Sequence, residues 1–150
     1  MVKRRLGKTE LMVSEIGFGA EWLERHPEEE SIELVRYAGE NGINIIDCWM
    51  PDYKSRNIIG KAISGQRSRW YIQGHVGSTL KDGQYYKTRD MSYVKPAFED
   101  LLERLRTDYI DLGMIHFVDS EEEWEWIQHS DYLEYILELK SKGIIHHIGM

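Results

Sequence analysis

The run Gly42-Ile43-Asn44-Ile45-Ile46-Asp47 is rich in β-branched residues and stands between a glycine and the turn expected at Pro51. Such side chains pack well on a pleated sheet, so the run predicts a buried strand. Residues 55–64 follow with a helical pattern, and Gly65 is placed to end that helix. Residues 70–75 form the next extended run. This strand–helix–strand unit implies two parallel strands joined by a right-handed crossover.

The same alternation extends from this unit toward both ends of the chain. Toward the amino end, residues 13–18 predict a strand and residues 31–41 a helix capped by Ser31. Toward the carboxyl end, the pattern predicts a helix, a strand, a helix and a fifth strand over residues 94–105, 109–116, 131–142 and 144–150. We expect an α/β fold with a parallel sheet, a small hairpin over residues 3–11 and a long loop over residues 78–90 that contains a turn at Lys81-Asp82-Gly83.

Two architectures fit this alternation, a doubly wound open sheet and part of a (β/α)₈ barrel. A dinucleotide-binding doubly wound sheet carries G-x-G-x-x-G after its first strand. Here Gly17-Phe18-Gly19 is followed by Trp22 where the third glycine is required. The pattern therefore favours the barrel.

Composition narrows the class of protein. The chain has 150 residues, the usual size of one domain. Its 41% apolar and 30% charged residues are typical of a globular protein and argue against disorder. The net charge of −7 disfavours nucleic-acid binding, and no apolar run approaches the roughly 20 residues of a membrane span. The single cysteine, Cys48, excludes an internal disulfide and indicates a reducing, cytoplasmic location.

Several motifs resemble those of the aldo-keto reductases, and together they extend over almost the whole chain. They are Arg5-Leu6-Gly7-Lys8-Thr9, Val13–Gly19, Gly42–Asp47, Ile59–Ala62, Leu101–Leu105, Thr107–Leu112, Ile115-His116, Gly143–Ile145 and Ile148-Gly149. The resemblance implies a (β/α)₈ TIM barrel that uses a nicotinamide cofactor, usually NADP(H), to reduce small-molecule carbonyls. Such barrels run to about 250 residues. Residues 1–150 are therefore expected to be the N-terminal half, truncated after the hairpin and about four to five β/α units.

Two details are most similar to one subgroup of that family. They are Lys81-Asp82-Gly83-Gln84-Tyr85 and the segment Gly113–Ser120. Members of this subgroup often carry a C-terminal iron–sulfur segment. The resemblance therefore implies a 4Fe-4S cluster in a part of the protein beyond residue 150.

The resemblance also implies catalytic residues at the C-terminal ends of successive strands, where barrel active sites lie. Asp47 ends the second strand and matches the family aspartate, and His116 ends the fourth strand and matches the family histidine. His75 stands where the family has a lysine that lowers the pKa of the catalytic tyrosine. The family tyrosine aligns with Asp52, and Tyr53 comes one residue later. Asp47, His116, His75 and Tyr53 are therefore the catalytic candidates, with the lysine and tyrosine altered.

The expected contacts to NADP(H) are Asp47 and Trp22, the latter in Ala20-Glu21-Trp22 after the first strand. In the family, much of the cofactor surface comes from strands five to eight. The resemblance therefore implies an incomplete cofactor site and weak NADPH binding by this chain.

Two other interpretations remain open. The altered lysine and tyrosine favour a chain that has lost reductase chemistry and serves as a binding or structural module. Asp47, His75 and His116 are also the residue types of a divalent-metal site. Each also has a structural alternative, a helix cap for Asp47 and a core position for His116.

Other conspicuous residues are expected to be structural. Cys48 is expected to be a small buried residue, because no base can be assigned to activate it. The remaining groups are expected to pack, to favour helix starts or to be solvated: His146-His147, Trp124 and Trp126 in a loop, Glu28–Glu30, Glu121–Glu123, and Lys81, Lys87 and Arg89. A half barrel also leaves strand edges unpaired, so we expect self-association or further chain to cover them.

Overall fold

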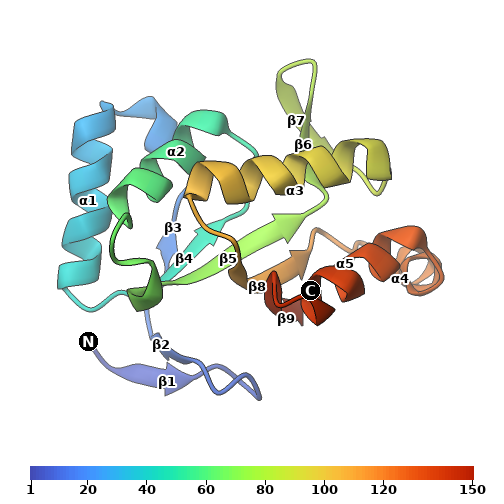
Figure 1. Ribbon diagram of the computed structural model, residues 1–150, viewed down its shortest axis with the longest axis horizontal. Helices are drawn as coiled ribbons and strands as arrows, with labels where there is room; N and C mark the ends of the chain where they lie inside the picture. The colour runs from blue at the N-terminus through green and yellow to red at the C-terminus, as the bar shows by residue number, and fades with distance from the viewer.

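A computed structural model describes all 150 residues, and its centre is a five-stranded parallel sheet (Figure 1). The strands are β3 (Phe18–Gly19), β4 (Ile45–Cys48), β5 (Tyr71–Val76), β8 (Ile110–Ile115) and β9 (Ile145–Gly149). Their order in the sheet is their order in the chain, and every neighbouring pair is parallel. A doubly wound sheet requires the strand order to reverse at one point. The strand order in this sheet does not reverse, so the sheet is part of a (β/α)₈ barrel, as expected.

One face of the sheet is covered by helices. They are α1 (Glu28–Glu40), α2 (Tyr53–Ala62), α3 (Met91–Leu105) and α5 (Asp131–Ser141), with α4 (Glu121–Gln128) before α5 and 3₁₀ turns at Leu23–Arg25 and Arg67–Arg69. Alternate residues of β5 are fully or almost fully buried, and Ile72 is 0% exposed. The core therefore lies between this face and the helices, as in the outer layer of a barrel.

The other face of the sheet carries several polar, half-buried side chains together with the buried Leu112. Asp47 is in register with Gln73, Gln73 with Leu112, and Leu112 with His147. In a sheet, register partners point to the same face, so these four side chains form one layer across it. This is the face that lines the inside of a barrel.

The amino-terminal hairpin differs from its expected limits. β1 (Lys3–Arg5) pairs with β2 (Met12–Ser14), so the strand expected over residues 13–18 is wrong. Only Phe18 and Gly19 join the parallel sheet. Asn44 gives the physical reason, because its side-chain oxygen accepts from the Ser14 backbone N–H at 2.7 Å and fixes the chain at this point.

A second hairpin replaces the long loop expected over residues 78–90. β6 (Ser78–Lys81) pairs antiparallel with β7 (Gln84–Lys87). Asp82 and Gly83 have φ values of 52° and 75°, as required by a two-residue type I′ turn. Gly77 has φ of 93°, and a Cβ there would lie 2.8 Å from the Thr88 carbonyl oxygen. The hairpins lie at opposite ends of the molecule, β1–β2 at the bottom and β6–β7 at the top of Figure 1.

Several helix limits also differ from expectation. α1 begins at Glu28 rather than Ser31, whose buried hydroxyl donates to the Leu23 carbonyl and does not cap the helix. α2 begins at Tyr53, capped by Asp52, whose carboxylate accepts from the Ser55 N–H at 2.7 Å. Residues 121–128 form α4 where a loop was expected, because Ser120 caps them. No helix in the structure is both long and apolar enough to cross a bilayer.

Candidate active site

Three of the four residues proposed as catalytic converge at one end of the sheet. Asp47 lies near the end of β4, His75 near the end of β5, and His116 directly after β8. The Nδ1 atoms of His75 and His116 are 2.9 Å apart, so one ring donates a hydrogen bond to the other. On the opposite side of His75, Nε2 lies 3.2 Å from Asp47 Oδ1. Parallel strands end at the same edge, which explains why residues so distant in sequence meet.

The contact between Asp47 and His75 has ion-pair distance without good hydrogen-bond geometry. Asp47 Oδ1 is buried and has no hydrogen-bond partner. The Gln73 side-chain amide also lies near the His75 ring, at 3.3 Å from Nε2. An amide offers a donor or an acceptor according to its rotation, so Gln73 suits either tautomer of His75. Asp47 therefore keeps an acceptor available at the site.

Tyr85, in β7 of the second hairpin, continues the same row of side chains. Its hydroxyl lies 2.7 Å from His116 Nε2. Four side chains, Asp47, His75, His116 and Tyr85, thus form a continuous polar chain from β4 to the hairpin. Sequence reasoning missed Tyr85 because residues 78–90 were expected to be a loop. The Asp82-Gly83 pair, a strong hairpin signal, could have revealed it.

His116 and Tyr85, at the hairpin end of this row of side chains, are both neutral near pH 7. Burial, and then the neighbouring His75, Arg89 and Lys87, lower the pKa of His116 from 6.5 to about 4. Burial also raises the pKa of the Tyr85 phenol. Tyr85 therefore keeps its proton, and His116 has one ring N–H and one free lone pair.

Aromatic rings surround the neutral His116 imidazole. Phe117 stacks on it with ring centroids 4.1 Å apart, and Trp49 lies parallel to it at 6.0 Å. Trp49 also meets the Tyr85 ring edge-on at 5.6 Å. Phe117 and Tyr85 are 52% and 41% exposed, so they form an apolar surface beside the polar chain that a ligand can reach. His116 itself is 0% exposed.

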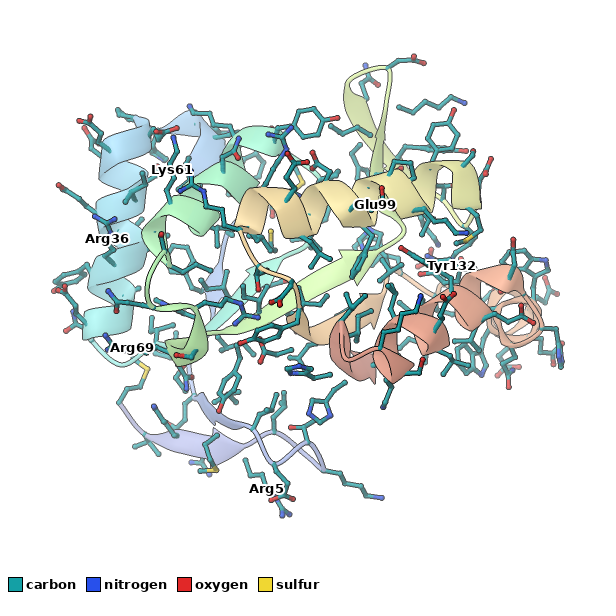
Figure 2. All side chains as sticks on the ribbon, viewed as in Figure 1. Arg5, Arg36, Lys61, Arg69, Glu99 and Tyr132 are labelled. Carbon is teal, nitrogen blue, oxygen red and sulfur yellow. The ribbon has the colours of Figure 1, made fainter.

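Buried side chains fix the backbone of this site. Arg89 donates to the carbonyl oxygens of His116 and Phe117, and Glu123 accepts from Arg89 at 3.1 Å. The Tyr132 hydroxyl donates to the Val76 carbonyl at 2.7 Å, and its place on α5 is labelled in Figure 2. Arg89 was expected to be solvated, and this expectation is wrong because its guanidinium ties the hairpin to the segment after β8.

Lys87 and Lys81, which also belong to the second hairpin, were likewise expected to be solvated. The Lys87 ammonium pairs with Asp119 and Glu123, so it too connects β7 to the start of α4. Lys81 Nζ lies 5.1 Å from the centre of the Tyr86 ring. The hairpin is therefore held in place mainly by Lys87 and Arg89.

The structure does not bring Tyr53 to the row formed by Asp47, His75, His116 and Tyr85. Tyr53 is the first residue of α2, and the Arg104 guanidinium of α3 lies 4.3 Å from the centre of its ring. Trp22 lies on the loop after β3, 45% exposed, with the Arg25 guanidinium 3.3 Å above its ring. Neither side chain has a contact with Asp47, His75 or His116 among those the structure shows.

The alternative of a divalent-metal site is not what the structure forms. No group of three His, Cys, Asp or Glu side chains is placed to hold a metal ion. The inner nitrogens of His75 and His116 face each other at 2.9 Å, a hydrogen-bond distance that leaves no space for an ion between them. A cavity of about 380 Å³ lies elsewhere, between the β1–β2 hairpin and α1, and is lined by none of these residues.

Comparison with known proteins shows the family of the chain. The model of the Aldo/keto reductase family matches residues 15–150. The chain belongs to the aldo/keto reductase family. The uncharacterized oxidoreductase YqkF of Bacillus subtilis is 32% identical over 154 aligned residues, which cover 100% of this chain and 48% of that protein.

Two solved structures show the same fold. Aldo-keto reductase AKR11C1 from Bacillus halodurans, in its holo form, superposes with a TM-score of 0.80 at 30% identity, over 99% of this chain and 49% of that one. An aldo-keto reductase from Klebsiella pneumoniae in complex with NADPH has a TM-score of 0.74 at 24% identity, over 99% and 49%. The chain thus spans about half the length of relatives such as these.

Proposed function

We propose that this chain supplies the carbonyl-binding residues of an oxidoreductase that reduces small-molecule aldehydes or ketones with NADP(H). The observation that carries this proposal is the continuous chain of Asp47, His75, His116 and Tyr85 at the C-terminal edge of the sheet. Barrel active sites are built at that edge. Neutral hydrogen-bond donors beside an exposed aromatic surface suit a carbonyl oxygen, on which negative charge develops during reduction.

The reacting end of a nicotinamide cofactor fits these residues, whereas its phosphates do not. Asp47 Oδ1 is an unused acceptor, and Trp49 and Phe117 offer flat apolar rings. When bound, the reduced nicotinamide supplies a hydride. Three cations in the segments after β3 and β5 are already engaged, since Arg25 lies over Trp22 and Lys87 and Arg89 pair with Glu123. We therefore expect most of a phosphate site to come from elsewhere in the protein.

The test is an assay of the full-length protein with NADPH and a series of simple aldehydes, in which the consumption of NADPH is monitored. We expect turnover, and we expect His116→Ala to lower kcat/KM about 100-fold because the site loses its central donor. His129→Ala is the matched control, since His129 is exposed at the end of α4. Unaltered activity in His116→Ala would refute the role of His116.

A second candidate function is a binding module without turnover. The position of the family tyrosine is Asp52, which caps α2, and Tyr53 packs against Arg104 instead of entering the site. Saturable NADPH binding by the full-length protein with no turnover of any aldehyde would favour this module over the reductase.

We also propose that the 150-residue chain associates with a second copy of itself. β3 and β9 each pair with one neighbour only, and the inner face between them is half-exposed. Unpaired strand edges are ready to pair with another chain.

A further inference from the structure

We propose that Tyr85 is the proton donor of the reaction, with His116 and His75 behind it as a relay that replaces its proton. The inference rests on the proposed reductase function and goes beyond it, because it assigns the donor to the β6–β7 hairpin rather than to the start of α2. Its basis is the juxtaposition of four side chains from four elements in one row: Tyr85, His116 and His75 are joined by hydrogen-bond distances, and Asp47 lies at ion-pair distance from His75.

Position is the first argument for Tyr85. Its hydroxyl is 2.7 Å from His116 Nε2, while the residue is 41% exposed at the surface of the site. A phenol at the open end of the row can therefore meet a ligand on one side and the imidazole on the other. Tyr53, the tyrosine expected from the sequence to be the donor, has the Arg104 guanidinium over its ring instead.

Proton placement is the second argument. Each contact in the row holds one proton, so the row has two self-consistent arrangements. In one, the Tyr85 hydroxyl donates to His116 Nε2, His116 Nδ1–H donates to His75 Nδ1, and His75 Nε2–H faces the Asp47 carboxylate. In the other, His75 carries a second proton, His75 Nδ1–H donates to His116 Nδ1, and His116 Nε2–H donates to the Tyr85 oxygen. The Tyr85 proton is then free to point at a ligand.

Reduction of a carbonyl converts the second arrangement of protons into the first. The carbonyl carbon gains a hydride from the reduced nicotinamide, and the π electron pair moves to the oxygen, which takes the Tyr85 proton. Tyr85 regains a proton from His116 Nε2, and His116 Nδ1 takes one from His75. The nicotinamide is oxidised, the carbonyl becomes an alcohol, and His75 ends neutral beside Asp47. His116 stays neutral throughout, as its buried position requires.

The hairpin is built to hold Tyr85 in this place. Arg89 and Lys87, at the base of β7, pair with Glu123 of α4, and Arg89 also holds the His116 carbonyl. The segment that directly follows β7 and the His116 backbone are therefore held together by the same buried guanidinium. A mobile loop would not keep the 2.7 Å contact.

The kinetic test compares Tyr85→Phe, Tyr86→Phe and Tyr53→Phe in the full-length protein. We expect Tyr85→Phe to lower kcat about 100-fold with little change in KM, since it removes the donor and keeps the ring. Tyr86 is the next residue of the hairpin and its ring packs on Tyr93, so Tyr86→Phe is the matched control and is expected to leave kcat unchanged. Equal kcat in Tyr85→Phe and wild type, or a loss confined to Tyr53→Phe, would overturn the proposal.

A second readout needs neither cofactor nor substrate. In protein labelled with ¹⁵N-histidine, Tyr85→Phe is expected to shift the His116 Nε2 resonance and to leave His129 unchanged. An unshifted His116 resonance would overturn the contact. If the unsubstituted protein reduces no carbonyl, the proposed function fails and the donor role fails with it. If it reduces carbonyls and Tyr85→Phe does so equally well, only the donor role fails.

Discussion

At the scale of single residues, His116 is the group whose protonation is most tightly linked to folding. It is fully buried, and its pKa is lowered from 6.5 to about 4, first by burial and then by His75 and the cations Arg89 and Lys87. A histidine that is harder to protonate when folded stabilises the folded state above its unfolded pKa. We therefore expect the free energy of unfolding to fall by about 3 kcal/mol between pH 6.5 and pH 4 through this residue.

The measurement is urea denaturation of the wild type and of His116→Gln at several pH values across that range. The variant has no titrating group at this position, so its stability is expected to vary less with pH than that of the wild type. His129→Gln, at an exposed position, should retain the wild-type dependence. Parallel pH profiles for wild type and His116→Gln would contradict the buried, neutral imidazole.

Three residues of the site could be predicted from the sequence, but the contact between Tyr85 and His116 could not. Asp47, His75 and His116 stand at the ends of expected parallel strands, so the rule for barrel active sites brings them together. The distances between their side-chain atoms depend on rotamers that no sequence spacing reveals. Tyr85 is 31 residues from His116 and reaches it only because Asp82 and Gly83 reverse the chain.

At the scale of elements, α2 and α3 are joined by a buried ion pair. The Arg56 side chain is only 2% exposed, and its Nη1 donates to Asp100 Oδ2 at 2.8 Å and to the Ala97 carbonyl at 3.1 Å. We expect Asp100→Ala to lower the free energy of unfolding by about 3 kcal/mol, because it leaves the guanidinium buried without its carboxylate. Chemical denaturation at neutral pH measures this loss.

The control for this prediction is an ion pair on the surface of α5. Glu138 and Lys142 pair across one turn with both side chains more than half exposed. Water screens such a pair, so Glu138→Ala is expected to leave the denaturation midpoint almost unchanged. Equal effects of Asp100→Ala and Glu138→Ala would show that burial of Arg56 adds nothing to the interaction.

Elements with strong periodicity were predicted well, and those that depend on distant contacts were not. The run at residues 43–47 and the helix with Val94, Phe98 and Leu101 on its buried face were recognised from their patterns. The first barrel strand was misplaced because its limit depends on the Asn44 side chain, 30 residues away from Ser14. The hairpin β6–β7 has polar residues on both strands, so its pattern shows no alternation of apolar and polar positions.

At the scale of the whole molecule, the sheet is curved and singly wound but not closed. Five strands follow one another in chain order, with helices on the outer face and Asp47, Gln73 and His147 on the inner one. A complete barrel has eight strands and no edges, and its inner face is filled by layers of side chains. In this chain, β3 and β9 are edges, and the inner layer is accessible to solvent.

These unpaired edges are expected to cause association in solution. Sedimentation equilibrium of the 150-residue chain is expected to give a concentration-dependent mass above the 17.7 kDa of one copy. His147→Lys places a charge on the inner face of β9, and charged edge strands resist pairing, so we expect it to weaken association at least about tenfold. Leu137→Lys, at a position of α5 that is 51% exposed, adds the same charge on the outer face and should change nothing. A folded monomer at every concentration would refute edge pairing, and equal effects of the two lysines would show that association uses the helical face instead.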